Sequence, residues 1–334
     1  VALAAASLAV MAHEPARVAI FGAGHTRRRL PIYGMLSVLG AIRAFSAPAS
    51  QVLMPSLVDR DELERAVALG SSSWQLAMIA GPSIGGAVYA ATGRASIVYV
   101  LCMLMALAAF ASVLRIGPGA MLTTDEKKRE PPSWSTLLAG LRYVWSNKPI
   151  LGAVSLDLFA VLLGGAVALL PIFARDLLHV GPWGLGILRS APAVGAATVA
   201  LALARYPLRR RAGAVMMVSV FLFGLGTIVF GLSTSFALSL IALLVLGASD
   251  MISVVVRSTL IQTRPPDEMR GRVGAVNMVF IGASNQLGEF ESGVTAEWLG
   301  PRVAVLVGGI GTCVVVVVWG VVFPALRTVD RLGD

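Results

Sequence analysis

Long apolar runs alternate with short charged loops along most of the chain. The hydrocarbon core of a membrane is about 30 Å thick, so a helix needs about 20 residues to cross it. Backbone groups in lipid must be hydrogen-bonded within the protein, and runs this long indicate helices rather than barrel strands. The pattern therefore predicts an all-α, polytopic helical membrane protein. We expect ten spans, at about 1–23, 31–53, 67–91, 95–115, 149–173, 181–204, 212–232, 235–261, 272–297 and 302–325.

The composition agrees with a chain that lies in lipid. Of its 334 residues, 57% are hydrophobic and only 13% are charged, whereas a soluble domain carries roughly a quarter charged residues. The net charge is +9, but the basic residues flank apolar runs, which indicates membrane anchoring rather than nucleic-acid binding. We expect the lipid bilayer as a partner and no nucleic acid.

The sequence indicates no cofactor, metal or enzyme chemistry. Cys102 and Cys313 both lie inside apolar runs, and the three histidines are scattered. No Cys or His spacing typical of zinc is present, and no glycine-rich loop typical of nucleotide binding. No nucleophile with a matching base stands out either.

Lysine and arginine are distributed unevenly over the two sets of loops. The set with 17 of them comprises Arg115, the loops 59–65, 123–148, 205–211 and 264–272, and the tail after Leu326. The opposite set holds six. Because cytoplasmic loops carry the excess of basic residues, both termini should face the cytoplasm. The basic stretch at 25–29 departs from this rule.

The chain contains a weak internal repeat. Residues 61–63 (Asp-Glu-Leu) align with 267–269 (Asp-Glu-Met), 206 residues later, and the helix after each copy ends at Gly93 or Gly300. Parallel repeats of this kind build several transporter folds. The same offset places the start of the first half roughly 60 residues before Val1. We therefore expect a twelve-helix protein without its first two helices, so that four plus six remain.

This arrangement predicts three regions. Residues 1–116 should form a partial N-terminal bundle, 117–148 a cytoplasmic linker, and 149–334 a C-terminal bundle of six helices. The end of the linker, at 133–145, has the apolar spacing of an interfacial helix.

Several short motifs resemble those of the major facilitator superfamily. "ALARYPLRRRAG" (202–213) resembles the basic loop between the second and third helices of a half, and "AIRAF" (41–45) the fourth-helix motif with an intramembrane arginine. "IAGPSIGG" (79–86) resembles the fifth-helix Gly-Pro motif of exporters. The residues that these motifs carry over are Arg43, Gly81, Pro82, Gly85, Gly86, Arg209, Arg210 and Arg211.

The resemblance implies conformational roles for two of these motifs. Besides anchoring the chain, the basic loop would contact helix ends and latch one conformation. The small residues of the Gly-Pro motif permit close helix packing, and in an exporter they would also seal the cavity. We favour close packing as the cause and export as its consequence.

Longer segments are similar to the bacterial enterobactin-exporter-like branch of that superfamily. They are "LDLFAVLLGGAVALLPIFARDLL", "LRSAPAVGA", "GASDMISVVVRSTLIQ" and "SNQLGEFESG". The resemblance implies a monomer in the bacterial inner membrane that exports a small organic molecule, siderophore-like or drug-like, with the proton gradient as energy source. Two alternatives remain open: import or facilitated diffusion of a metabolite, and a truncated, inactive membrane protein.

Charged residues inside the spans are the candidates for proton coupling, because a charge at mid-membrane is costly unless it is paired or hydrated. Asp157, Asp250 and Glu289 are the candidate proton carriers, and the alternative is that each belongs to a structural ion pair. Asp250 and Arg257 are seven residues apart, hence about two turns along one helix face. Arg43 and Asp250 hold near-equivalent positions in the two halves and are candidates to face each other across a cavity.

Two carboxylates and an amide lie close together in the span at 272–297. Asn285 and Glu289 are four residues apart and share a helix face. Glu291 is two residues further on and cannot share that face. We expect Glu289 to meet the cavity and Glu291 to pack against a neighbouring helix. Arg189, about one turn inside the span at 181–204, completes the set of charged candidates.

Overall fold

The described part of the chain covers most of the last eight predicted spans. The computed structural model describes residues 63–115, 134–206, 208 and 210–330, with four isolated helical positions at 34, 38, 40 and 42. The first two predicted spans otherwise lie outside the described residues, so the count of ten spans stays a prediction. The chain divides into two compact units, residues 1–129 and 130–334.

At two places in the described residues, successive α-helices are joined by a connection of one or two residues that begins with glycine. In the first unit Gly93 follows α4 (Leu63–Thr92) and leads into α5 (Ala95–Leu114). In the second unit Gly300 follows α12 (Asp267–Leu299) and leads into α13 (Pro301–Val322). Both glycines have positive φ, +64° and +84°, a conformation that residues with a Cβ adopt only at a cost. The internal repeat places these same two glycines at equivalent helix ends.

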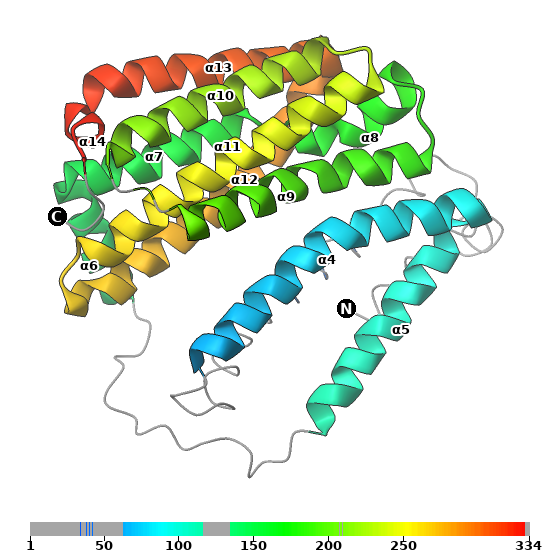
Figure 1. The fold of residues 1–334 in the computed structure, drawn as a ribbon, viewed down its shortest axis with the longest axis horizontal. Coiled ribbons are helices and arrows are strands. Elements are labelled where there is room, and N and C mark those ends of the chain that lie inside the picture. The colour runs from blue at the N-terminus through cyan, green and yellow to red at the C-terminus, as the bar shows by residue number, and fades with distance from the viewer. Residues whose placement is uncertain are drawn as a thin grey trace. The chain divides into compact units, whose positions relative to one another are not determined.

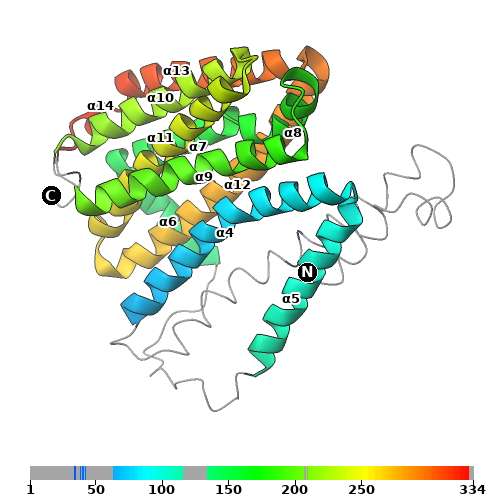
Figure 2. The same cartoon turned by 45° about the vertical axis from the view of Figure 1, so that its right-hand side comes forward.

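The second unit is a bundle of long helices (Figure 1, Figure 2). α6 (Trp134–Ser146) precedes α7 (Lys148–Leu163), and the Asn147 side chain between them caps α7 by accepting the Ile150 N–H. The α-helices after residue 180 are α9 (Pro182–Arg205), α10 (Ala212–Leu232), α11 (Phe236–Thr263), α12, α13 and the short α14 (Pro324–Arg327). α11 packs against α9 and α10, α10 against α13, and α12 against α6 and α7.

Six helical segments of the described residues are long and apolar enough to cross a membrane. They are Ala95–Leu114, Lys148–Leu177, Pro182–Arg205, Ala212–Leu232, Phe236–Thr263 and Pro301–Val322. Each coincides with a predicted span, and the prediction of a polytopic helical membrane protein is confirmed. α4 and α12 are long helices at two further predicted spans; α12 is more polar than the six, and in α4 the stretch Leu76–Thr92 is apolar.

The segment predicted as one span at 149–173 is helical but interrupted. α7 ends at Leu163, and Gly164 and Gly165 separate it from a 3₁₀ turn (η3, Ala166–Leu169), α8 (Leu170–Ile172) and a π-helical turn (η4, Phe173–Leu177). A Cβ on Gly164 would collide with the Phe223 ring of α10, and one on Gly165 with the Ser292 side chain of α12. Two neighbouring helices thus approach the backbone at the break, which hydropathy does not reveal.

Glycines let the helices of the second unit pack backbone to backbone. A Cβ on Gly195 of α9 would overlap a carbonyl of α11, and one on Gly247 of α11 would overlap a carbonyl of α9. α10 and α13 approach each other in the same reciprocal way at Gly224 and Gly309. Because lipid supplies no hydrophobic driving force between helices, close van der Waals packing of this kind holds the bundle together.

The helix predicted at 133–145 is observed as α6. A Cβ on its Gly140 would lie 2.6 Å from the Arg272 carbonyl oxygen, so this side of α6 packs tightly on α12. Leu138 and Trp145 lie on the other side and are 59% and 69% exposed. α6 therefore presents apolar side chains outward, and its position at the membrane interface stays a prediction.

Replacing Gly247 by alanine should destabilise the protein, because the new methyl group would overlap the Pro192 carbonyl. We expect a loss of about 1–3 kcal/mol, the usual cost of overpacking, measured as a lower thermal unfolding midpoint of the detergent-solubilised protein. Gly274→Ala is the matched control, since no atom lies within 4 Å of a Cβ there and alanine favours helix. Equal midpoints for the two variants would contradict the close packing of α9 against α11.

Candidate functional site

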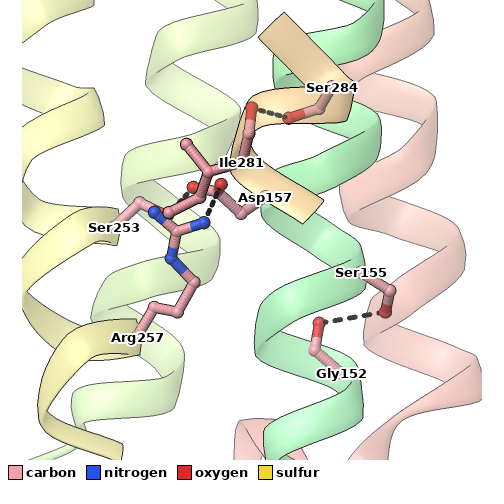
Figure 3. A network of polar contacts seen from close by, with 7 residues as sticks. All are labelled: Gly152, Ser155, Asp157, Ser253, Arg257, Ile281 and Ser284. Atoms are coloured by element: carbon pink, nitrogen blue, oxygen red, sulfur yellow. Dashed lines mark hydrogen bonds and ion pairs between the residues drawn. The ribbon is translucent and has the colours of Figure 1, made fainter. Parts of the chain in front are cut away.

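A buried ion pair joins α7 to α11 in the second unit (Figure 3). Arg257 Nη1 donates to Asp157 Oδ2, and the Ser253 hydroxyl donates to Asp157 Oδ1 at 3.2 Å. The Arg257 and Asp157 side chains are only 4% and 6% exposed. Because Ser253 and Arg257 are four residues apart, one face of α11 delivers both donors to the same carboxylate.

The ion pair lies in apolar surroundings. Leu156 and Val256, which precede the two charged residues in sequence, are fully buried in one hydrophobic cluster. An isolated charge in such a place would cost several kcal/mol, so each member of the pair stabilises the other. Arg257 Nε is buried without a hydrogen-bond partner among the described residues. The Nε–H of Arg257 is therefore a hydrogen-bond donor next to the ion pair that no described residue accepts.

A small cavity lies beside the ion pair and brings Asp250 to it. Four polar residues, Asp157, Ser249, Asp250 and Ser253, line the cavity together with apolar side chains of α7 and α10. Its size leaves room for about one water molecule. Within the described residues, the Asp250 carboxylate forms no ion pair and no hydrogen bond. Two carboxylates thus border one small space, and only one of them has a basic partner.

The sequence does not reveal this pairing. Asp157 and Arg257 each stand out in it as a charge inside a span, but Arg257 shares a helix face with Asp250 and not with Asp157. Ser253 is not among the residues predicted for the site. The spacing of 250, 253 and 257 places three polar residues on one face of α11, and this was the available signal for a polar site.

Two of the carboxylates of α12, Glu289 and Glu291, lie on different sides of the helix. Asn285 and Glu289 are exposed, whereas Glu291 is half-buried and accepts a hydrogen bond of 2.8 Å from the Thr295 hydroxyl. Ser284 is buried and donates to a carbonyl of its own helix (Figure 3). That Glu289 and Glu291 point to different sides agrees with their spacing of two residues in the sequence. The position of Glu289 in a cavity stays a prediction.

The other predicted residues do not join this cluster. Arg189 is exposed on α9, and Arg210 and Arg211 are exposed just before α10. Arg43 and Arg209 lie outside the described residues, so the facing of Arg43 and Asp250 stays a prediction. No group of three or more His, Cys, Asp or Glu that would hold a metal occurs in the described part of the chain.

The Gly-Pro motif lies within α4, and Pro82 is inside the helix. A Cβ on Gly85 would lie 3.9 Å from Val98 Cγ1 of α5, an ordinary contact. A Cβ on Gly81 would have no atom within 4 Å, and Gly86 is half-buried. Close packing of another helix on this motif therefore stays a prediction.

Comparisons with known proteins agree with this architecture. A family model described as a transmembrane secretion effector matches residues 4–332. The enterobactin exporter EntS of Citrobacter koseri is 29% identical over 277 residues, which make up 83% of this chain and 65% of that protein. Proteins of the same name from Shigella boydii and Escherichia coli are 28% identical over 237 residues, 71% of this chain and 56% of theirs. The chain thus spans 56–65% of the length of these relatives, which are named as exporters and not as enzymes.

Removing one member of the buried ion pair should destabilise the protein strongly. Asp157→Asn and Arg257→Met each leave an uncompensated polar or charged group, and we expect about 3–5 kcal/mol from either change. The double variant leaves no charge unpaired and should be more stable than either single variant, as measured by thermal unfolding in detergent.

Asp176→Asn provides the control for this experiment. It removes an ion pair with Arg175 at 2.5 Å, in which the side chains are 79% and 45% exposed. Exposed pairs contribute little, so its unfolding midpoint should not change. Strictly additive losses in the Asp157/Arg257 double variant would show that the two charges do not depend on each other.

Proposed function

The chain belongs to the transmembrane secretion effector family of the major facilitator superfamily, and on this premise we propose that it exports a small organic molecule in exchange for protons. The family makes it a membrane transporter and favours export. The relatives are named for enterobactin, which supports a siderophore-like substrate, with drug-like molecules as the wider class. The chain spans 56–65% of the length of these relatives. The substrate and the proton coupling are therefore proposals for this chain and are not taken over from the relatives.

The observation that carries the proposal is the unpaired Asp250 beside the Asp157–Arg257 pair. The charges of Asp157 and Arg257 cancel, so the charge state of Asp250 sets the net charge of the cluster. With a proton on Asp250 the cluster is neutral, and without it the cluster carries one negative charge in an apolar bundle. Since an unpaired charge away from water is costly, proton binding at Asp250 is coupled to closing the site.

This coupling gives a cycle of alternating access. Asp250 takes up a proton from the side where the cavity is open and hydrated, and the neutral cluster then passes through the closed state. On the opposite side renewed hydration favours loss of the proton. The Ser249 and Ser253 hydroxyls, which line the same space, offer hydrogen-bond partners to a water molecule that carries the proton in and out.

Two exposed polar residues of α12, Asn285 and Glu289, support a solute-binding site that is separate from the proton site at Asp250. α12 is the long helix of the second unit that is too polar to count among the apolar spans. Asn285 and Glu289 lie exposed on it, and such groups are stable in a membrane protein where they meet water, solute or a polar partner. We assign them to solute binding, since their oxygens accept hydrogen bonds from hydroxyl or amine groups.

The proposal includes the topology that the basic loops indicate. Both termini face the cytoplasm of a bacterial inner membrane. So does the linker at 117–148, which connects a helical bundle at 1–116 to a six-helix bundle at 149–334. The protein acts as a monomer. Arg209, Arg210 and Arg211 latch one conformation, and the motif from Gly81 to Gly86 seals the cavity through close helix packing.

Asp250→Asn should abolish proton-driven export, because the amide is permanently neutral and cannot release a proton. In proteoliposomes with an imposed pH gradient, uphill movement of enterobactin should fall to background, while exchange of labelled for unlabelled enterobactin at equal pH persists. Glu297→Gln, which removes an exposed carboxylate near the end of α12, should behave as wild type in both assays. Normal uphill export by Asp250→Asn would sink the assignment.

Glu289→Gln should weaken solute binding without loss of stability, because the side chain is exposed. Losing a hydrogen bond to a charged group is expected to raise the KM for enterobactin about tenfold. Glu291→Gln is the matched control two residues away: its amide oxygen still accepts the Thr295 hydroxyl hydrogen, so it should leave both the thermal midpoint and the KM unchanged. The same KM for both variants would contradict a solute contact at Glu289.

A further inference from the structure

The N-terminus of α10 is capped by a distant part of the chain. The first N–H groups of a helix have no partner within the helix, and the Arg211 side chain at the N-cap position supplies none. Instead, Asp330 Oδ1 accepts the Arg211 N–H at 2.9 Å, and the Asp330 carbonyl accepts the Ala212 N–H at 3.3 Å. The Val329 carbonyl accepts the Gly213 N–H at 3.1 Å. Residues 119 positions apart thus complete one helix end.

The capping segment is also held by apolar contacts. α13 ends at Val322, Pro324 begins the short α14, and the chain turns back across the start of α10 (Figure 1, Figure 2). Leu326 and Val329 are 0% and 3% exposed. They belong to the hydrophobic cluster that contains Ala153 and Leu156 of α7 and Ala212 and Met216 of α10. Residues 323–330, here called the clasp, therefore bind α7 and α10 together.

The fit between the clasp and α10 depends on a glycine. A Cβ on Gly213 would overlap the Leu326 carbonyl, so the clasp lies directly on the first turn of α10. Arg211, next to this contact, has φ +56°, a left-handed conformation that costs energy in a residue with a Cβ. Three hydrogen bonds on residues 211–213 hold this backbone in place. Such a conformation persists where its surroundings determine it.

The clasp adjoins the basic loop and shares a hydrophobic cluster with the sequence neighbours of the ion pair. The loop between α9 and α10 contains the arginines of the 202–213 motif and ends at the capped residues. The hydrophobic cluster that receives Leu326 also contains Leu156 and Val256, the sequence neighbours of Asp157 and Arg257. Undocking the clasp would release the backbone at residues 211–213 and expose the part of this cluster that Leu326 and Val329 cover.

We propose that residues 323–330 act as an intramolecular clasp that fixes the arginine-bearing loop between α9 and α10 to the end of the bundle, and that transport requires the docked clasp. The consequence for transport rests on the proposed export function. The docking itself does not, because it follows from the three hydrogen bonds and the two buried side chains. The clasp makes the ends of α7, α10 and α13 move as one body during the cycle.

The test compares two substitutions at one position. Asp330→Ala removes the side-chain oxygen that accepts the Arg211 N–H, whereas Asp330→Asn keeps an equivalent oxygen, since Asn and Asp cap helices about equally well. Amide hydrogen exchange at residues 211–213 should be about fivefold faster in Asp330→Ala and unchanged in Asp330→Asn. Amides at 308–312, inside α13, are the internal control and should exchange at the wild-type rate in both variants.

A second variant approaches the contact from the other side. Gly213→Ala places a methyl group against the Leu326 carbonyl and should accelerate exchange at the same amides. In proteoliposomes, Asp330→Ala and Gly213→Ala should export enterobactin more slowly, and Asp330→Asn at the wild-type rate.

Three results overturn the proposal in different ways. Unchanged exchange at 211–213 in Asp330→Ala would show that the clasp does not hold the loop. Faster exchange with a wild-type export rate would show that transport does not need the clasp. If the wild-type protein does not move enterobactin at all, the proposed function fails, while the exchange measurements still decide whether the clasp is docked.

Discussion

The neutralisation of charge inside an apolar bundle is the constraint on which the rest of the structure depends. Asp157 and Arg257 come from different helices, and neither is tolerable in lipid-like surroundings without the other. Their pairing fixes the rotation of α7 and α11 about their own axes, because both side chains must point into the same buried space. That fixed register is what brings Asp250 to the cavity beside them.

Close packing provides the second constraint, since a bundle in lipid cannot rely on expulsion of water between its helices. The reciprocal glycine contacts of α9 with α11 and of α10 with α13 bring backbones together at defined points. Close packing also occurs at the interruption after α7. There the Phe223 and Ser292 side chains leave no room for a Cβ on Gly164 or Gly165. The places where helices of this bundle approach most closely are therefore set by the positions of its glycines.

Local features of the fold could be predicted from the sequence, and long-range pairings could not. Hydropathy predicts the six apolar spans from short stretches alone. The internal repeat predicts Gly93 and Gly300 as helix ends, because two short stretches of similar sequence can be compared directly. The partners of Asp157 and of the α10 N-terminus lie about 100 and 119 residues away. Nothing within either stretch specifies such a partner, since any intramembrane cation or any acceptor would satisfy the same local need.

The polarity of α12 has a consequence for how the protein reaches its final state. A segment with charged residues at its centre partitions poorly into a bilayer by itself, since each acidic or basic group at mid-helix costs about 2.5–3.5 kcal/mol on insertion scales. Gly300 connects α12 directly to the strongly apolar α13. During biosynthesis α12 and α13 are therefore best inserted together as a helical hairpin. The favourable transfer of the apolar α13 into lipid then offsets the cost of transferring the polar α12.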